Sequence, residues 1–384
     1  MVFLCGCAAL FWVIFLGGGI VHLFQVKRLE RQYPPEPPSW PRLCVVIAAR
    51  DEVGTIEPAM RSLLGQDYPG LEVILVDDRS GDGTGAVADR LASEDPRLKV
   101  VHNADLPEEW LGKVHALDLG VRSTSGEWVL FTDADVHFAP GALRLAISLC
   151  EERGLDHLAL MPDVPSDTFV HTMLLHAFFL WFLLFTDAVR IEKGSRRAFA
   201  GAGAFNLVRR SAFNRTPGFE WLKMEVADDL GLGIMMKNHG ARQGFYLASE
   251  HVSVRWYETP GDMIRGLEKN AFSMDRYSYA RLLFTQGVVW SFLMAPLLAL
   301  FPWGIPFLWL GAAVPAAFLA AQAIVQSRVT RDTSGAAFLI PLGIVAISFA
   351  ALRSAWKCRR RGGIVWRGRS YPLEDLRNGQ RVKF

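Results

Sequence analysis

The sequence is poor in cysteine and nearly balanced in charge, and both features narrow its function. Its 384 residues include 5 cysteines. None of them forms a C-x-x-C pair, so neither a zinc site nor a disulfide framework is predicted. The formal net charge is +2 at pH 7, which argues against a nucleic acid as a partner. No glycine-rich basic loop follows the first predicted strand, which argues against a nucleotidyltransferase.

Long apolar runs are plentiful instead, and one of them opens the chain. Hydrophobic residues make up 51% of the sequence, and residues 1–26 form an almost uninterrupted apolar run. About 20 apolar residues can span a bilayer. We expect a transmembrane anchor here rather than a cleaved signal peptide, because no positive residue precedes the run. Lys27, Arg28 and Arg31 follow directly, which predicts that the chain continues in the cytoplasm.

A second apolar region, residues 282–352, predicts two or three further membrane segments. The first two form a hairpin that turns at residues 302–304. If the last segment also crosses, the basic tail at residues 353–384 lies outside, against the positive-inside rule. A re-entrant last segment, or one miscounted pass, would remove this conflict. We therefore expect a multi-pass protein of the cell membrane with its soluble domain in the cytoplasm.

Residues 170–189 are also strongly apolar, but a crossing here would separate acidic residues that we expect in one compartment. We therefore predict either a helix that lies at the membrane interface or a buried helix. His171, His176 and Asp187 are expected on or near its polar side.

Between the apolar regions, residues 42–275 alternate between strand and helix patterns. We expect strands at residues 43–49, 71–76, 98–102 and 127–131, and helices at residues 55–64, 83–93 and 112–123. This alternation predicts an α/β fold with a parallel sheet and helices on both faces. In such sheets the ligand binds beyond the carboxyl ends of the strands.

Acidic residues collect where these strands end. The triplet Asp133-Ala134-Asp135 follows the fourth predicted strand, and Asp77-Asp78 follows the second. Two carboxylates one residue apart offer the hard oxygen ligands that a divalent cation carrying a diphosphate needs. A further pair, Asp228-Asp229, lies downstream. These stations suggest an enzyme that handles a sugar nucleotide.

Five motifs in order complete a resemblance to the family-2 inverting glycosyltransferases with the GT-A fold. They are V-V-I-A-A-R-D-E at 45–52, D-D-R-S-G-D-G-T at 77–84, G-K-V-H-A-L at 112–117, D-A-D at 133–135 and D-D-L-G-L-G at 228–233. The resemblance covers residues 43–272. Within the family it is closest to membrane-anchored lipid glycosyltransferases associated with hopanoid and carotenoid biosynthesis. That narrower match rests on W-L-G-K at 110–113, G-L-E-K-N-A-F at 266–272 and the tail G-I-V-W-R-G at 363–368.

The resemblance implies a fold and a donor site. The fold would be a Rossmann-like, mostly parallel sheet with helices on both faces, and transmembrane helices at both ends of the chain. Asp78 would accept hydrogen bonds from the uracil or ribose of a nucleotide sugar, expected to be a UDP-sugar, because those groups are donors. Arg50 and Glu52 would flank the base.

The resemblance also implies a metal and its ligands. Asp133 and Asp135 would hold Mg²⁺ or Mn²⁺ against both phosphates, and the cation would neutralise charge on the leaving diphosphate. Lys113 would add a positive charge there, although a solvated helix lysine fits its position as well.

Inversion requires one general base, and the resemblance assigns it to Asp229. This carboxylate would take the proton from the acceptor hydroxyl at hydrogen-bond distance. Asp228 replaces the Glu of the family, so the choice between the two neighbours stays open, as does a role of both as a helix cap. Small residues at 201–204 either allow close approach to the sugar or pack sheet against helix.

One family motif is missing, and its absence bears on the product. Processive members carry Q-x-x-R-W after the base; here Arg265, Lys269 and Asn270 lie in that region instead. We therefore expect one sugar transfer to a membrane lipid of isoprenoid, hopanoid or glycerolipid type. The alternatives are a short-chain glycan synthase and a catalytically silent membrane scaffold, and the intact acidic motifs argue against the second.

Overall fold

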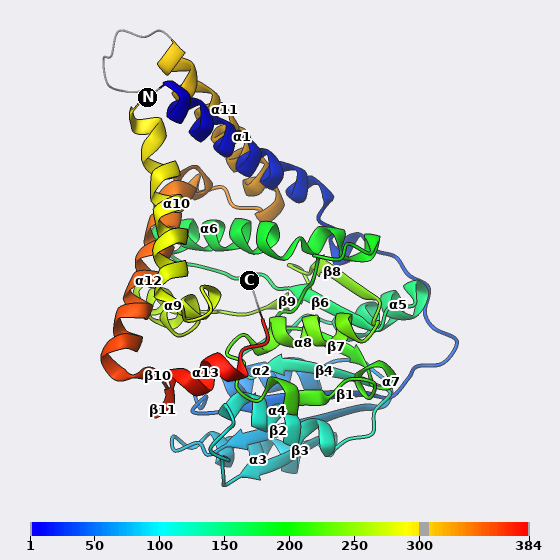
Figure 1. Cartoon of the computed structure of the whole chain (residues 1–384). Helices are drawn as coiled ribbons and strands as arrows, with labels where there is room; N and C mark the ends of the chain where they lie inside the picture. The colour runs from blue at the N-terminus through cyan, green and yellow to red at the C-terminus, as the bar shows by residue number, and fades with distance from the viewer. Residues whose placement is uncertain (1, 299–306, 383–384) are drawn as a thin grey trace.

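The structure is a computed structural model that describes residues 2–298 and 307–382, and its centre is a seven-stranded sheet in the order β3-β2-β1-β4-β7-β6-β8 (Figure 1). The strands are β1 Leu43–Ala49, β2 Leu71–Asp78, β3 Leu98–Asn103, β4 Trp128–Asp133, β6 His157–Met161, β7 Asn206–Arg209 and β8 Gln243–Leu247. The first four are parallel to one another. Strand β7 runs antiparallel to both β4 and β6. The predicted parallel sheet is therefore confirmed for its first half, and the whole sheet is mixed.

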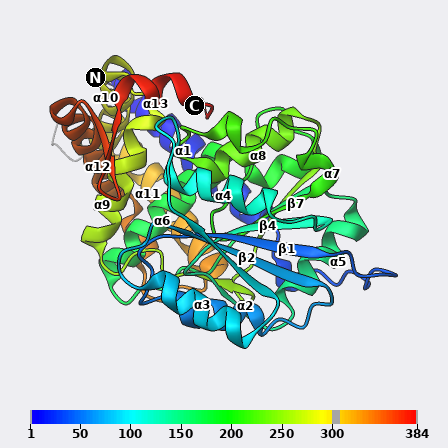
Figure 2. The same ribbon diagram turned by 90° about the horizontal axis from the view of Figure 1, so that it is seen from below.

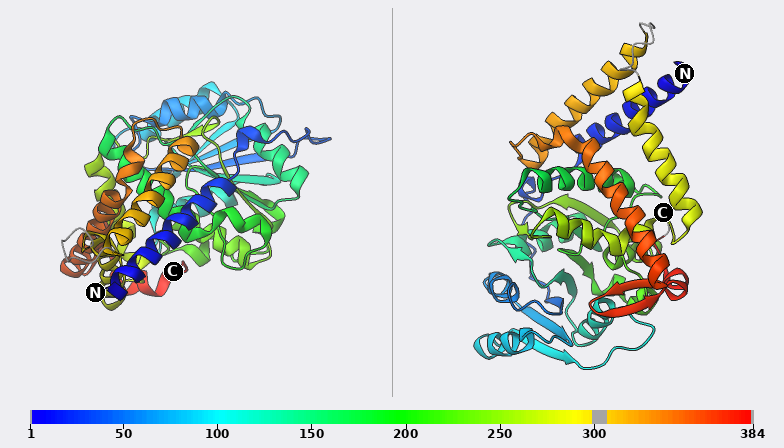
Figure 3. Two further views of the ribbon diagram at one scale, coloured as in Figure 1. Left: turned by 90° about the horizontal axis from the view of Figure 1, so that it is seen from above. Right: turned by 90° about the vertical axis from the view of Figure 1, so that its left-hand side faces the viewer.

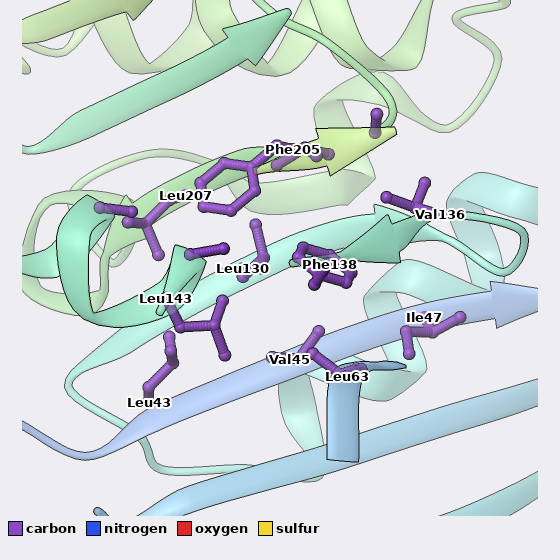
Figure 4. Packing of buried hydrophobic residues seen from close by; sticks show 14 of the residues in the cluster. Leu43, Val45, Ile47, Leu63, Leu130, Val136, Phe138, Leu143, Phe205 and Leu207 are labelled. Carbon is purple, nitrogen blue, oxygen red and sulfur yellow. The ribbon is translucent and has the colours of Figure 1, made fainter. Parts of the chain in front are cut away.

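Helices cover both faces of the sheet because the side chains of its strands alternate between two cores. Leu43, Val45 and Ile47 of β1 face one core, whereas Cys44 and Val46 face the other. Figure 4 shows the first core around Leu43 and Val45, and Figure 2 shows helices on either side of the sheet. The first core holds α2 Ile56–Leu64, α3 Thr84–Glu94 and α5 Ala142–Arg153; the second holds α4 Gly112–Arg122 and α8 Asp228–Asn238.

The register of the parallel strands brings the predicted site residues to one edge. Ala49 of β1 pairs with Asp77 of β2, and Ala48 pairs with Asp133 of β4. The three strands therefore end side by side. Asp78 and Asp133 are the last residues of their strands rather than the first residues after them.

The apolar segments gather on the far side of the sheet, around helix α6 (Phe169–Thr186). Helices α1 (Val2–Gln25) and α11 (Phe307–Thr330) lie side by side above it, as Figures 1 and 3 show. In the described part of the chain, Phe169–Lys193 and Ala336–Arg361 are long and apolar enough to cross a membrane. Half of the first stretch is buried inside the protein, which core helices of soluble proteins also show.

The polar residues of α6 are not on a solvated face, which corrects the expectation for two of them. His171 and His176 are buried. His176 Nε2 lies 2.9 Å from Asp332 Oδ2, in the loop after α11. Asp187, at the end of α6, accepts from His22 Nε2 of α1 at 2.9 Å. These side chains join α6 to its neighbours, because a polar group buried among apolar helices needs a partner.

The last apolar segment leads back to the sheet. Helix α10 (Tyr279–Leu298) precedes α11, and the predicted turn at residues 302–304 lies outside the described residues. Helix α12 (Ile340–Arg361) begins against α6, where Gly343 faces Ala177. It ends at a hairpin of β10 (Gly363–Trp366) and β11 (Arg369–Pro372), followed by α13 (Leu373–Gly379). The basic tail therefore lies beside the sheet (Figure 3).

The remaining elements are short, except for one helix that borders the site. They are β5 His137–Phe138 paired with β9 Val252–Ser253, α7 Arg210–Phe213, α9 Pro260–Met274 and the 3-10 turns Leu29–Arg31, Ala188–Lys193, Gly218–Leu222 and Ala336–Leu339. Helix α9 packs along α12 and brings Lys269 toward the strand ends.

Candidate active site

A lysine joins two of the predicted acidic stations. Lys113, in the first turn of α4, places its Nζ 2.6 Å from Asp133 Oδ1 and 3.4 Å from Asp228 Oδ2. Burial alone would lower the pKa of this amine, but Asp133, Asp228 and Asp229 together raise it above its ordinary value. Lys113 is therefore a fixed positive charge between two carboxylates, and the solvated-helix interpretation is wrong.

Asp229, the predicted base, is held by backbone amides. Its Oδ1 accepts from Leu230 N at 2.8 Å, and its Oδ2 accepts from Gly203 N at 3.2 Å. Burial first, and then the charge of Asp228, raise the pKa of the Asp229 carboxyl. Asp228 is 8% exposed and faces Lys113. A carboxylate with a raised pKa is a better proton acceptor near neutral pH.

Two glycines, Gly201 and Gly203, lie where Asp133 and Asp229 approach each other. Gly203 O accepts from Asp133 N at 3.2 Å, while Gly203 N donates to Asp229. A Cβ on Gly203 would lie 2.6 Å from Asp133 Oδ2, and one on Gly201 would lie 1.9 Å from Asp229 O. The small residues therefore allow close approach of the two acidic stations to each other.

The oxygen ligands present suit a cation that also binds phosphate. Asp135 is half-buried, and burial together with the charges of Asp133 and Glu52 raises its pKa to about 7. In the described part of the chain no three His, Cys, Asp or Glu side chains are arranged to hold a metal ion. Mg²⁺ usually takes one or two carboxylates and completes its shell with substrate phosphates and water. Asp133 and Asp135 fit that pattern.

Asp78 lies at the expected edge but already has partners within the protein. Arg79 Nε and Nη2 donate to its two carboxylate oxygens at 2.9 and 2.8 Å. Asn103 Nδ2 donates to Asp78 Oδ1 at 2.8 Å. Arg50 Nη1 lies 3.9 Å from Asp78 Oδ2. Sequence reasoning missed Arg79 and Asn103, although Arg79 is adjacent to the motif.

The first loop is joined to the C-terminal hairpin. Glu52 Oε1 accepts from Arg367 Nη2 at 2.8 Å, and Arg50 Nη2 donates to the carbonyl of Arg367 at 3.1 Å. The motif of the tail at residues 363–368 was part of the stated resemblance, but no role was predicted for it. Its sequence separation from Glu52 exceeds 300 residues, so no local pattern could have indicated this contact.

Buried polar side chains behind Asp229 fix its backbone. Asn206 Nδ2 donates to Asp229 O at 3.2 Å. The His157 ring lies between Asn206 Oδ1, at 2.6 Å from Nε2, and Gln243 Nε2, at 2.7 Å from Nδ1. Burial lowers the pKa of His157 to about 4, so the ring is neutral and donates to Asn206. No motif in the sequence indicated this network.

The region expected to replace Q-x-x-R-W divides into two parts. Arg265 forms an ion pair with Asp262 at 2.6 Å on the exposed face of α9, away from the acids. Lys269 Nζ lies 4.2 Å from the ring centroid of Trp366. Burial, with the nearby charge of Lys113, lowers the pKa of Lys269 to about 8. Of the two cations, Lys269 is the one near the site.

Residues 44–216 match the sequence model of the family described as Glycosyl transferase family 2. A Beta-monoglucosyldiacylglycerol synthase of Synechocystis sp. is 28% identical over 252 residues, which are 61% of this chain and 50% of that protein. A GalNAc(5)-diNAcBac-PP-undecaprenol beta-1,3-glucosyltransferase of Campylobacter jejuni is 31% identical over 112 residues, 29% of this chain and 35% of that protein. The chain spans about half or less of the length of these curated relatives.

A solved structure shows the same fold over nearly the whole chain. It is the mannosyltransferase PcManGT from Pyrobaculum calidifontis in complex with GDP-Man and Mn²⁺. The TM-score is 0.53 at 19% sequence identity, and the match covers 92% of this chain and 98% of that one.

Proposed function

We propose that the chain is a glycosyltransferase that moves a sugar from a nucleoside-diphosphate sugar to a membrane lipid with inversion, because residues 44–216 match the family 2 glycosyltransferase model and a relative is named for lipid glucosylation. The observation that supports this most is the junction at Gly203, which bonds to both Asp133 and Asp229. A phosphate-side acid and a proton acceptor must flank one anomeric carbon in an inverting transfer, and this junction holds them together.

In the proposed reaction Asp229 accepts the proton of the acceptor hydroxyl. The oxygen attacks the anomeric carbon, the bond from that carbon to the diphosphate oxygen breaks, and the electron pair stays on the diphosphate. Lys113 adds positive charge on the departing side, where a low dielectric strengthens it. Mg²⁺ or Mn²⁺ held by Asp133 and Asp135 would neutralise the negative charge of the diphosphate. Asp78, Arg50 and Glu52 form the nucleoside side.

The names of the relatives favour a lipid acceptor, and the packing of α6 suggests its path. Both curated relatives are named for transfer to a lipid or a lipid-linked sugar. The ring of Phe178, on α6, lies 4.7 Å from that of Trp256, which lies 4.9 Å from that of Tyr257. Burial and the charge of Asp133 raise the pKa of Tyr257 to about 12. Tyr257 is therefore close enough to Asp133 to feel its charge, and the row of aromatic rings runs from α6 toward the proposed catalytic acids.

The proposed arrangement in the membrane follows from the same packing. Helices α1, α10 and α11 cross, α6 lies at the interface, and α12 returns from α6 to the sheet without crossing. The tail then lies on the cytoplasmic side with the catalytic domain, which removes the conflict with the positive-inside rule. Arg361→Cys, on the tail side of α12 in a chain whose native cysteines are replaced, should react with an impermeant maleimide only after the cells are opened. Labelling of intact cells would place the tail outside.

The proposed activity is tested by incubating membranes that contain the full chain with a panel of labelled nucleotide sugars. Lipids are then extracted and separated by chain length, with and without EDTA. We expect one donor to label a lipid by a single sugar, and the label to disappear with EDTA or with Asp229→Asn. Labelled polymer would indicate a glycan synthase instead. Hydrolysis alone, or no turnover with any donor, would contradict the proposal.

A further inference from the structure

The C-terminal hairpin turns in a way that presents Arg367 to the donor side of the site. Arg367 and Gly368 are the two residues between β10 and β11, and both have positive φ, 47° and 78°. Two such residues define the tight hairpin turn whose twist matches the paired strands. A non-glycine residue rarely adopts this conformation. The turn therefore holds an arginine where glycine or asparagine would fit with less strain.

The rest of the tail is fixed to the catalytic domain at two places after the hairpin turn. Arg369 donates to the carbonyls of Leu106, Pro107 and Glu108, the last at 3.0 Å. Glu225 Oε2, which lies just before α8, accepts from Arg381 N at 2.7 Å. The hairpin is thus held against the loop before α4, and the end of the chain against the segment before the proposed base.

The two cations on this side have fewer acidic partners than the other cations of the site. Within the described residues, Lys269 has no carboxylate at ion-pair distance, and its ammonium lies over Trp366 of the hairpin. The Arg367 side chain is 44% exposed and makes one ion pair, to Glu52. By contrast, Lys113 lies between two acids and Arg79 binds both oxygens of Asp78. Lys269 lies over Trp366, the neighbour of Arg367 in the chain, so both cations would attract an anion bound beside the hairpin.

We propose that the C-terminal hairpin is a wall of the donor site and that Arg367, with Lys269, binds the diphosphate of the nucleotide sugar. This inference rests on the proposed function. Arg367 already contacts Glu52, which is expected beside the nucleobase, and the diphosphate must lie between the nucleobase and Asp133. A guanidinium offers a planar pair of donors that matches phosphate oxygens.

The test uses the full chain in membranes and the donor identified by the panel. Arg367→Asn removes the charge and keeps the turn, because asparagine tolerates positive φ. Arg367→Gly keeps the turn without any side chain, and Arg367→Lys keeps a charge. Arg361→Asn, at the exposed end of α12, is the matched control. We expect Arg367→Asn and Arg367→Gly to raise the KM of the donor about tenfold.

Inhibition by nucleotides identifies the group that Arg367 contacts. Inhibition by the free nucleoside diphosphate should weaken about tenfold in both neutral variants, and inhibition by the monophosphate less than about threefold. Arg367→Lys should recover part of the loss, and the KM of the acceptor should stay unchanged. A donor KM within twofold of the wild type in both neutral variants would overturn the inference, as would equal weakening of both nucleotides. An inactive wild-type chain would instead contradict the proposed function.

Discussion

Replacing Gly203 by alanine is a demanding test of the proposed site, because it adds one methyl group at the junction of the metal-side and base-side acids. The new Cβ would lie 2.6 Å from Asp133 Oδ2 and 3.6 Å from Lys113 Nζ. The first distance is about 1 Å short of an ordinary nonbonded contact. The backbone at Gly203 is not left-handed, so alanine adds no conformational strain there. The Asp133 carboxylate must therefore move.

A displacement of this size predicts a large effect on rate and a small effect on folding. Misplacing a catalytic group by about 1 Å can cost about 100-fold in rate, which corresponds to about 2.7 kcal/mol of transition-state stabilisation. The side chain of Asp133 is 38% exposed, so it can turn outward without unfolding the sheet. We expect kcat/KM to fall about 100-fold while the melting temperature stays within a few degrees.

The assay compares sugar transfer to lipid by wild type, Gly203→Ala and Gly287→Ala in the same membranes. Gly287, on α10, has nothing within 4 Å of its added Cβ, so this variant makes the same chemical change at a site without neighbours. The half-saturating Mn²⁺ concentration is measured as well, because a displaced Asp133 should raise it. A Gly203→Ala enzyme with kcat/KM within threefold of the wild type would refute the proposed junction.

Four further substitutions test single groups in the same assay. Asp229→Asn should lower kcat about 10²- to 10⁴-fold with little change in the KM of the donor, and a larger loss in Asp228→Asn would move the base to that neighbour. Lys113→Gln removes the positive charge beside Asp133 and Asp228, so the half-saturating Mn²⁺ concentration should fall while kcat also falls at least tenfold; unchanged values of both would contradict its role. Lys269, whose pKa is lowered to about 8, loses its proton as pH rises through that value, so kcat/KM for the donor should decline above about pH 8. Lys269→Arg should remove this decline, and a decline that persists would assign it to another group.

The strand-end acids could be predicted from sequence because one physical rule places them. Parallel strands with crossover helices bring their carboxyl ends to one edge of the sheet. The alternation of strand and helix was therefore enough to predict that Asp78 and Asp133 lie at the same edge. Which partner each acid takes was not predictable in this way. Asp78 accepts hydrogen bonds from Arg79 and Asn103. Which side chains reach its carboxylate depends on side-chain geometry.

Contacts between distant parts of the chain lay beyond the reach of local patterns. The hairpin that meets Glu52 follows three apolar helices, and the distance along the chain exceeds 300 residues. Likewise, α12 is apolar enough to predict a crossing, but Gly343 allows it to begin directly against α6. Hydropathy measures whether a helix prefers an apolar environment and does not distinguish lipid from protein.

In the proposed reaction, the ion pairs of Lys113 would connect donor binding to the protonation state of Asp229. Its ammonium is shared between Asp133 and Asp228, with the shorter contact to Asp133. In the proposed reaction, a cation and diphosphate bound at Asp133 would neutralise its negative charge and weaken its attraction for Lys113. Lys113 is then held chiefly by Asp228, whose charge is one cause of the raised pKa of Asp229. When Lys113 neutralises Asp228 more fully, the pKa of Asp229 should fall. Asp229 should then lose its own proton after the donor has bound, and so become able to accept the proton of the acceptor hydroxyl.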